Sequence, residues 1–173
     1  MKLTAKTITQ TALFSAIICV LGPLTIPIGP IPLSLCTLAI MITACVAGVV
    51  RSLVAVLVYV AIGTIGLPVF SGFTGGVGVL AGPTGGYLVG YLLCALIVSL
   101  LARLNTVWVY PVASALGTLA LYAFGTAWFV IQTQSNVLYA LTVCVLPFLI
   151  GDAIKIVVVT LVTPRLRKVL KEK

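Results

Sequence analysis

Two ionisable residues, Asp152 and Lys155, stand inside an otherwise apolar run, PFLIGDAIKIVVV. Residues three apart lie on one face of a helix, so the carboxylate and the ammonium can reach each other. A charge within a membrane-spanning segment costs about 3 kcal/mol, and a buried ion pair adds little stability because desolvation offsets the attraction. One interpretation is a mutual ion pair with no further role. The interpretation we favour is a binding site for a polar solute or an ion.

The composition places these two charges in a membrane protein. Of the 173 residues, 62% are hydrophobic and 7% are charged, and the mean hydropathy is +1.33. A water-soluble domain carries about 25% charged residues, so this chain lacks the polar surface to cover a globule in water. We expect one domain over residues 1–173, an all-α integral membrane protein. A spanning helix needs about 20 apolar residues, and six transmembrane helices are expected, at about residues 8–22, 35–50, 52–66, 84–102, 108–130 and 147–163.

Two further apolar segments need their own interpretation. Residues 136–146 are too few to span and precede Pro147. We interpret them as a half-helix or re-entrant piece leading into the last helix, with Pro147 in the first turn of that helix. The N-terminal run, MKLTAKTITQTALFSAIICVLG, has the basic front and apolar body of a signal peptide. We favour a first membrane helix, because no small-x-small cleavage site follows it.

Positive charge is placed asymmetrically along the expected helices. With the N-terminus in the cytoplasm, nine of the ten cations fall on the cytoplasmic side and none in an outer loop, in line with the positive-inside rule. We therefore expect a multi-pass protein of the cell membrane with both termini cytoplasmic. The cations lie at membrane edges without interleaved aromatic residues, so the net charge of +8 does not indicate a nucleic-acid partner. The basic tail, TPRLRKVLKEK, is expected to meet anionic lipid headgroups.

The residue types do not support metal or cofactor binding, ATP hydrolysis or enzymatic catalysis. The chain has no histidine, and its five cysteines lie apart in apolar runs, where we interpret them as small buried hydrophobic residues. Neither a metal site nor a cofactor is expected. GPTGG lacks the spacing and the lysine of a phosphate-binding loop, so any pumping needs energy from another protein. An intramembrane enzyme would have to use a Ser–Lys pair such as Ser71 with Lys155, and we expect no enzymatic activity.

Nine of the sixteen glycines fall in residues 66–91, GLPVFSGFTGGVGVLAGPTGGYLVGY. Residues 67–83 connect the third and fourth expected helices on the outer side, the same side as the Asp152–Lys155 pair. Non-helical backbone at membrane depth is tolerated only where it is buried in protein or lines a cavity. We expect this glycine-rich outer loop to fold inward and offer backbone groups to a ligand. Gly82, Gly86 and Gly90 recur every four residues and predict a ridge for close helix packing.

These stretches resemble a known family. The glycine-rich segment, followed some sixty residues later by LPFLIGDAIK, closely resembles the BioY family, the biotin-binding S components of energy-coupling factor (ECF) transporters. IPIGPIPLSLCTLAIMITACVAG is similar as well, and the match covers about residues 5 to 165. The resemblance implies a six-helix membrane protein that captures biotin from outside. It implies as partners a transmembrane coupling subunit and two cytosolic ATP-hydrolysing subunits. A stand-alone facilitator or channel for biotin or a related solute is the alternative.

The family's functional residues carry over to matching positions here. In the family the glycine loop and the GD-x-x-K helix line the vitamin site, which implies Asp152, Lys155, Phe73, Thr74, Gly75, Gly85 and Tyr87. S components contact the coupling subunit through an A-x-x-x-A face on the first helix, which Ala12 and Ala16 match; packing within the chain is the other interpretation. Where many members read P-x-T-L-Q-T, this chain reads PLSLCT, so Cys36 stands in place of glutamine and is left out of the site.

The chemistry of biotin suits the two charged residues. An ionised aspartate only accepts hydrogen bonds, so Asp152 suits the two N–H groups of the ureido ring. Lys155 either holds Asp152 in place or donates to a ligand oxygen. The biotin carboxylate is met by loop N–H groups and water, or by Lys155 itself. Phe70, Phe73 and Tyr87 are candidates to flank the apolar thioether ring.

Overall fold

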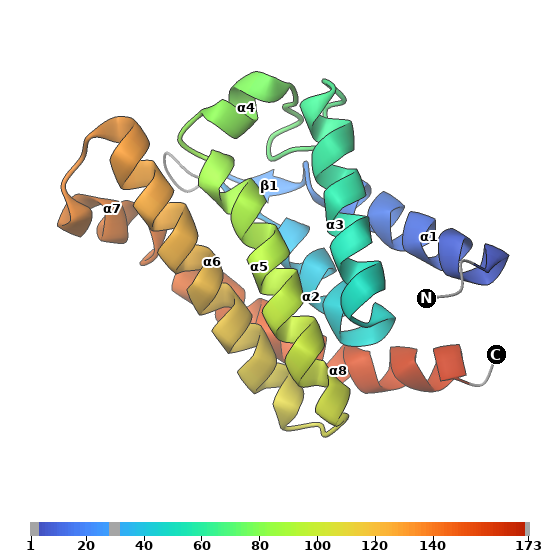
Figure 1. The fold of residues 1–173 in the computed structure, drawn as a ribbon. Helices are drawn as coiled ribbons and strands as arrows, with labels where there is room; N and C mark the ends of the chain where they lie inside the picture. Colours follow the sequence, from blue (N-terminus) through green and yellow to red (C-terminus); the bar gives the residue numbers. More distant parts are fainter. Residues whose placement is uncertain (1–3, 28–31, 172–173) are drawn as a thin grey trace.

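The computed structural model describes residues 4–27 and 32–171. The described chain is mostly helical, with one short antiparallel hairpin (Figure 1). The hairpin consists of β1 (Thr25–Ile26) and β2 (Leu33–Ser34). The helices are α1 (Ala5–Leu21), α2 (Cys36–Ala47), α3 (Val49–Thr64), α4 (Val77–Ala81), α5 (Gly85–Leu101), the 3-10 turn η1 (Ala102–Leu104), α6 (Val109–Thr133), α7 (Val137–Cys144) and α8 (Phe148–Lys171).

Helix α2 lies at the centre of the bundle and packs against α1, α3, α5 and α8. Nine of its 12 residues are buried, because it carries no charge and is built from small and apolar residues that other helices can approach closely. Its C-terminal neighbour Gly48 takes a positive φ of 81°, which is a backbone conformation open to glycine. That single residue turns the chain directly into α3.

Helices α5 and α6 form the most extensive pair, and glycines set their approach. A Cβ atom on Gly86 would lie 2.2 Å from the Cβ of Trp128, and one on Gly90 would lie 2.7 Å from a methyl group of Leu121. The indole Nε1 of Trp128 also donates to the carbonyl of Gly82 at 3.0 Å. The expected glycine ridge is therefore confirmed at Gly86 and Gly90.

Each of the six expected spans coincides with a helix. The ends differ by at most three residues, except that α8 continues to Lys171, eight residues past the expected end. Within the described residues, two helices are long and apolar enough to cross a membrane, Gly85–Leu104 and Val109–Thr133, or three if the bent pair α7 and α8 counts as one span. Six crossings are thus not confirmed by helix length. Helix α2 has 12 residues and a length of about 18 Å, because the hairpin precedes it and Gly48 ends it.

The segment before α8 is a short helix, as expected for a broken span. Helix α7 covers eight residues and is inclined by 45° to α8. Helix α8 begins at Phe148, so Pro147 lies just before the helix and not within its first turn. Asp152 consequently lies in the second turn of α8, and Lys155 lies on the same face three residues later.

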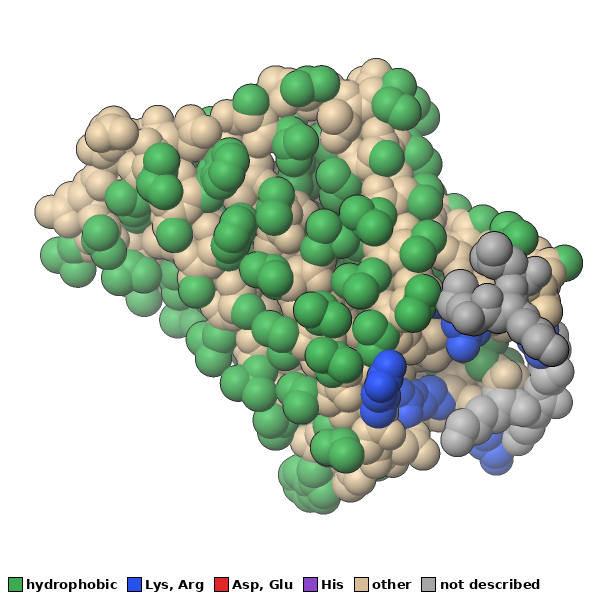
Figure 2. Space-filling view, in the orientation of Figure 1, with side chains coloured by type: hydrophobic (Ala, Val, Ile, Leu, Met, Phe, Trp, Pro, Cys, Tyr) green, Lys and Arg blue, Asp and Glu red, His purple; other side chains and the backbone are tan. Residues whose placement is uncertain are grey.

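Positive charge gathers at one end of the bundle. Figure 2 shows the Lys and Arg side chains grouped near the two termini, while hydrophobic side chains are spread over the remaining visible face. Apart from Lys155, the described cations lie at the start of α1 and α3, in η1 and in the last turns of α8. The hairpin, α4 and the glycine-rich loop lie at the opposite end (Figure 1).

The α5–α6 interface generates the first prediction. Gly86→Ala forces a methyl group against Trp128, so it should lower the unfolding free energy by about 1–3 kcal/mol. Gly78→Ala is the matched control, because a Cβ there meets nothing within 4 Å. Thermal unfolding of the detergent-purified chain should show a lower midpoint for Gly86→Ala alone. Equal midpoints for the two variants would contradict the close packing.

Candidate substrate-binding site

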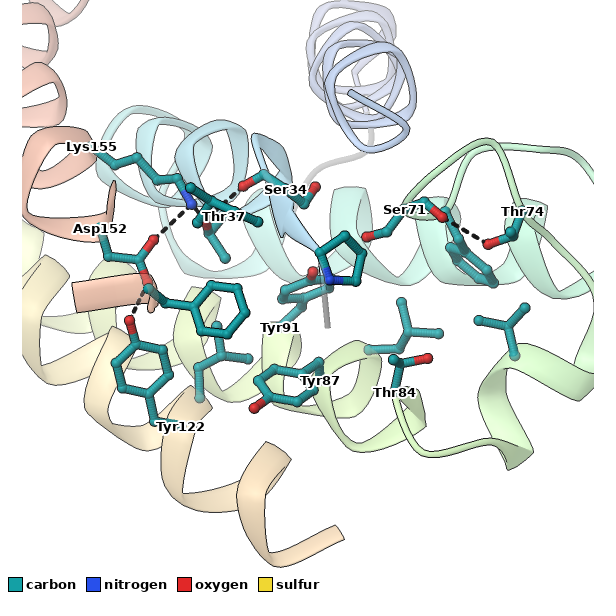
Figure 3. Close-up of a pocket in the computed structure, with 17 residues that line it drawn as sticks. Ser34, Thr37, Ser71, Thr74, Thr84, Tyr87, Tyr91, Tyr122, Asp152 and Lys155 are labelled. Atoms are coloured by element: carbon teal, nitrogen blue, oxygen red, sulfur yellow. Dashed lines mark hydrogen bonds and ion pairs between the residues drawn. The ribbon is translucent and has the colours of Figure 1, made fainter. Parts of the chain in front are cut away.

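A cavity lies among α2, α5, α6 and α8, at the end of the bundle away from the clustered cations (Figure 3). The β1–β2 hairpin and the glycine-rich loop complete its wall. Its empty space, counted together with the opening to solvent, is about 690 Å³. Asp152 and Lys155 form part of its wall, and both side chains are buried. Its lining residues are Pro32, Leu33, Ser34, Thr37, Phe70, Ser71, Thr74, Val79, Thr84, Tyr87, Leu88, Tyr91, Leu121, Tyr122, Phe148, Asp152 and Lys155.

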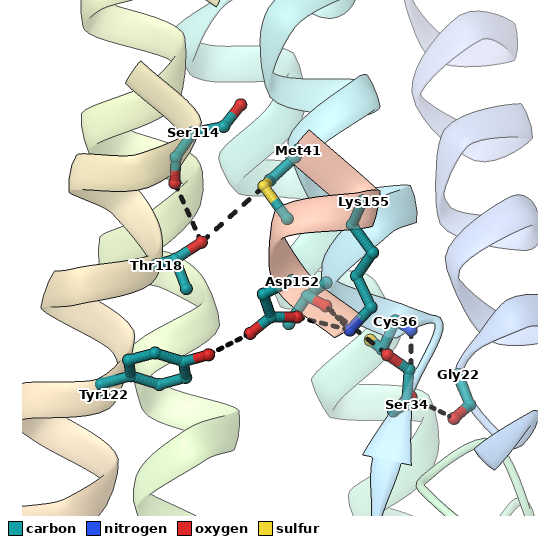
Figure 4. A network of polar contacts seen from close by, with 10 residues as sticks. Gly22, Ser34, Cys36, Met41, Ser114, Thr118, Tyr122, Asp152 and Lys155 are labelled. Atoms are coloured by element: carbon teal, nitrogen blue, oxygen red, sulfur yellow. Dashed lines mark hydrogen bonds and ion pairs between the residues drawn. The ribbon is translucent and has the colours of Figure 1, made fainter. Parts of the chain in front are cut away.

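The two charged residues form an ion pair that neighbouring helices hold on both sides. Lys155 Nζ lies 2.7 Å from Asp152 Oδ1 and donates to Thr37 Oγ1 of α2 at 2.8 Å. The phenol of Tyr122 on α6 donates to the other carboxylate oxygen, Asp152 Oδ2 (Figure 4). Within the described residues this is the one ion pair, and it joins three helices through four side chains.

The hydrogen-bonding capacity of this group is not exhausted. An ammonium has three donors, and Lys155 uses one on Asp152 and one on Thr37. A carboxylate has about four acceptor positions, and Asp152 uses two, one for Lys155 and one for Tyr122. The remaining donor and acceptor positions are available to a polar ligand in the cavity. In a medium poor in water, such a ligand satisfies groups that otherwise stay unpaired.

The rest of the wall is apolar in the middle and polar again at the far end. Figure 3 shows Tyr87 and Tyr91 between the two ends of the cavity, and the ring of Phe70 also lines it. Figure 3 shows the hydroxyl-bearing residues Ser71 and Thr74 at the opposite side of the cavity from Asp152, with Thr84 nearer to them than to the ion pair. Thr84 directly precedes the first turn of α5. The cavity therefore offers two separated polar groups with aromatic surface between them.

The glycine-rich loop contributes Phe70 to this wall. The Phe70 ring is buried and packs edge-on against Tyr59, with ring centroids 5.6 Å apart. It occupies the space beside Gly63, where a Cβ would lie 2.2 Å from the ring. Gly76, at φ 99°, closes the loop by donating its N–H to the Gly63 carbonyl at 2.7 Å. The loop thus folds inward onto α3, as its composition led us to expect.

The β1–β2 hairpin is anchored beside the ion pair by one serine, Ser34. Ser34 Oγ donates to the carbonyl of Gly22 at 2.8 Å and accepts from the backbone N–H of Cys36 at 2.9 Å (Figure 4). This ties β2 to the end of α1 and starts α2 with Thr37 directed at Lys155. The Cys36 side chain is fully buried and lies outside the cavity lining.

The residues expected at the site fall into two groups. Asp152, Lys155, Thr74 and Tyr87 line the cavity. Phe73, Gly75 and Gly85 lie outside the lining. Phe73 is 66% exposed with a positive φ of 59°, and the two glycines allow close backbone contacts, Gly75 with the Leu67 carbonyl and Gly85 with the Leu80 carbonyl. Contact with a ligand remains a prediction for all seven.

Sequence reasoning missed several residues that line the cavity, most importantly Thr37, Tyr91 and Tyr122. A signal for Tyr122 was present, because Ser114, Thr118, Tyr122 and Thr126 recur every four residues on α6, and all four are buried. Tyr91 follows Tyr87 at the same spacing. Polar residues at i, i+4 share one helix face, so each series marks the side turned to the bundle interior.

Residues 1–172 match the sequence model of the BioY family. The chain belongs to the BioY family. Among its relatives is a protein of Thermotoga maritima named biotin transporter BioY, which is 38% identical over 92% of this chain and 94% of its own length. A biotin transporter BioY of Rhodobacter capsulatus is 36% identical over 91% of this chain and 90% of its own length.

A solved structure supports the same assignment at the level of the fold. This BioY-family chain is similar to the crystal structure of the S-component for biotin from an ECF-type ABC transporter, with a TM-score of 0.87 and 31% identity. The alignment covers 94% of this chain and 91% of the solved one. The family assigned from the two long motifs is therefore confirmed, together with the mostly helical fold.

The buried ion pair generates the second prediction. Lys155→Met leaves the Asp152 carboxylate buried without its partner, which should cost about 3–5 kcal/mol of stability. The double variant Asp152→Asn/Lys155→Met removes both charges and should be clearly more stable than Lys155→Met alone. Thermal midpoints of the ligand-free wild type, Asp152→Asn, Lys155→Met and the double variant measure the difference as a double-mutant cycle. Additive losses would show that the two charges do not depend on each other.

Proposed function

We propose that this chain binds biotin and serves as the substrate-binding S component of an ECF-type ABC transporter for biotin uptake. The observation that carries the proposal is the buried Asp152–Lys155 pair with unused hydrogen-bonding capacity at the wall of a cavity. Membership of the BioY family and the likeness to a biotin S component support it. Relatives named as biotin transporters support transport and not catalysis.

Biotin has two polar ends separated by an apolar thioether ring and chain, and the cavity has a matching distribution. We assign the ureido ring to the Asp152 end, where the carboxylate accepts its N–H groups and the third Lys155 donor meets the ureido oxygen. The thioether ring lies among Phe70, Tyr87 and Tyr91. Tyr122 and Thr37 act on the ligand indirectly, since they hold the two charged groups in place.

The biotin carboxylate then lies at the far polar group of the cavity. Ser71, Thr74 and Thr84 supply hydroxyl groups there, and the 17-residue helix α5 starts directly after Thr84. The helix dipole favours an anion at a helix N-terminus. This arrangement leaves Lys155 to the ureido end and needs no second cation at the cavity.

Six membrane crossings, with both termini in the cytoplasm, fit the charge distribution. The clustered cations then face the cytoplasm, and the cavity opens toward the outside. Helices α1, α2 and α3 have 17, 12 and 16 residues, so in this arrangement loops and hairpin complete the crossings. Such irregular backbone is acceptable within the membrane because it lies on protein and lines the cavity.

The partners are a transmembrane coupling subunit and two cytosolic ATP-hydrolysing subunits. Helix α1 packs on α3 and α2 with one side, and Ala12 and Ala16 lie exposed on the other. Small residues four apart let another helix approach closely. Biotin enters from outside, the loaded chain docks through α1, and ATP hydrolysis in the partner subunits reorients it so that the cavity faces the cytosol.

Replacement of the acidic residue tests the site assignment. Asp152→Asn removes a charged acceptor and should weaken biotin binding by about 10- to 100-fold, measured by isothermal titration calorimetry in detergent. Thr160→Val is the matched control, because Thr160 lies on the same helix and outside the cavity lining. Within the described residues its hydroxyl donates only to the carbonyl of Ile156. Unchanged affinity in Asp152→Asn would remove Asp152 from the site.

Bulky residues on α1 test the transport assignment. Ala12→Leu/Ala16→Leu should abolish ATP-driven biotin uptake in vesicles that contain the partner subunits, while biotin affinity stays unchanged. The control is Ala123→Leu, an exposed alanine on α6. A stand-alone facilitator would behave differently, since vesicles with this chain alone would take up biotin at the same rate with and without the double substitution.

A further inference from the structure

A second pocket lies at the opposite end of the bundle from the biotin cavity. It is enclosed by the starts of α1 and α3 and the ends of α2 and α8, and its empty space is about 630 Å³ with the opening to solvent included. Gln10, Arg51 and Arg167 form its polar side. Phe14, Val46, Ala47 and Leu170 form its apolar side. The proposed biotin function uses none of these residues.

The two arginines bring positive charge to this pocket, and among the described residues no carboxylate lines it. Arg51 Nη1 donates to the neutral amide oxygen Gln10 Oε1 at 2.6 Å. Arg167 is fixed by carbonyl groups of Cys45 and Ala102, at 2.7 and 2.8 Å, and stacks on Tyr110. Among the residues that the structure describes, the one ion pair is in the biotin cavity.

The geometry points to a binding site for the phosphodiester group of an anionic phospholipid. A guanidinium has five N–H donors arranged to match phosphate oxygens. In the described part of the chain, Arg51 has one hydrogen-bonded partner, so donors remain for a ligand. Arg167 is held rigidly by its backbone partners, so its charge is already oriented when a ligand arrives.

The other half of the pocket favours a lipid over a soluble anion. Phe14 and Val46 give it an apolar wall. Beside it, α1 exposes Leu13 and Ile17, and α8 exposes Val169 and Leu170. Acyl chains can follow such a surface while the headgroup stays with the arginines. Basic pockets between helices at the cytoplasmic membrane edge have the chemistry that anionic headgroups require.

Titration of the purified full-length chain with phosphatidylglycerol in neutral detergent tests this site. Wild type should bind phosphatidylglycerol and gain thermal stability from it, while phosphatidylcholine and inorganic phosphate should have no such effect. Arg51→Gln should weaken phosphatidylglycerol binding by about tenfold or more. Arg103→Gln is the matched control, since it removes one exposed charge at the same membrane edge outside the pocket.

A second pair of variants tests the pocket without touching an arginine. Leu170→Glu places a carboxylate at the pocket and should abolish phosphatidylglycerol binding, while Val169→Glu, at an exposed neighbouring position outside the lining, should have little effect. Biotin binding should persist in all four variants, which confirms that each is folded.

Three outcomes would overturn the inference. Equal losses in Arg51→Gln and Arg103→Gln would mean diffuse attraction of lipid to the charged end. An equal response to phosphatidylcholine, or to inorganic phosphate, would remove the selectivity for an anionic lipid. Wild-type lipid binding by Arg51→Gln, together with failure to copurify with the coupling subunit, would make the pocket a docking site for that protein.

Discussion

The structure depends on one constraint, a carboxylate and an ammonium that must be held apart from lipid. Asp152 and Lys155 lie on a single face of α8, and both are more than nine-tenths buried. Burial of these two charges costs desolvation free energy, which the further hydrogen bonds from Tyr122 of α6 and to Thr37 of α2 offset. Three helices therefore have to converge at one depth, and the cavity forms where their polar groups meet.

The irregular segments follow from the same constraint. Helices alone leave the cavity open at its end of the bundle. The glycine-rich loop and the β1–β2 hairpin supply the rest of its wall. Phe70 enters the wall because Gly63 leaves room for its ring and Gly76 closes the loop onto α3. Ser34 performs the corresponding task for the hairpin, since its hydroxyl joins α1 to the start of α2.

The ends of the bundle carry different chemistry, and α8 connects them. Its first turns bear the ion pair at the cavity, and its last turns bear Arg167, which binds the carbonyl groups at the ends of α2 and α5. Close packing at Gly86 and Gly90 keeps α5 and α6 together as a rigid pair beside α8.

The positions of the helices and of the Asp152–Lys155 pair could be predicted from local sequence patterns. Apolar run lengths located the helices, Pro147 and the short run before it indicated α7, and two charges in an apolar run marked the site. Tyr122 and Thr37 were missed because a tyrosine or threonine in a membrane helix is compatible with many environments. Phe73 and Gly75 were placed at the site because the glycine loop lines it in the family that the sequence resembles, but the turn at Phe73 directs that side chain to solvent.

By itself, the sequence determined that the chain is helical and apolar, that its charge is concentrated at one end, and that α8 carries an acid and an amine on one face. These properties depend on residue type and on spacings of three or four, which local geometry converts directly into position. Only the tertiary structure decided which hydroxyl groups hold the ion pair, which aromatic rings line the cavity, and that a second pocket joins Arg51 to Arg167. Those contacts link residues 30 to 118 positions apart, and the packing of whole helices sets them.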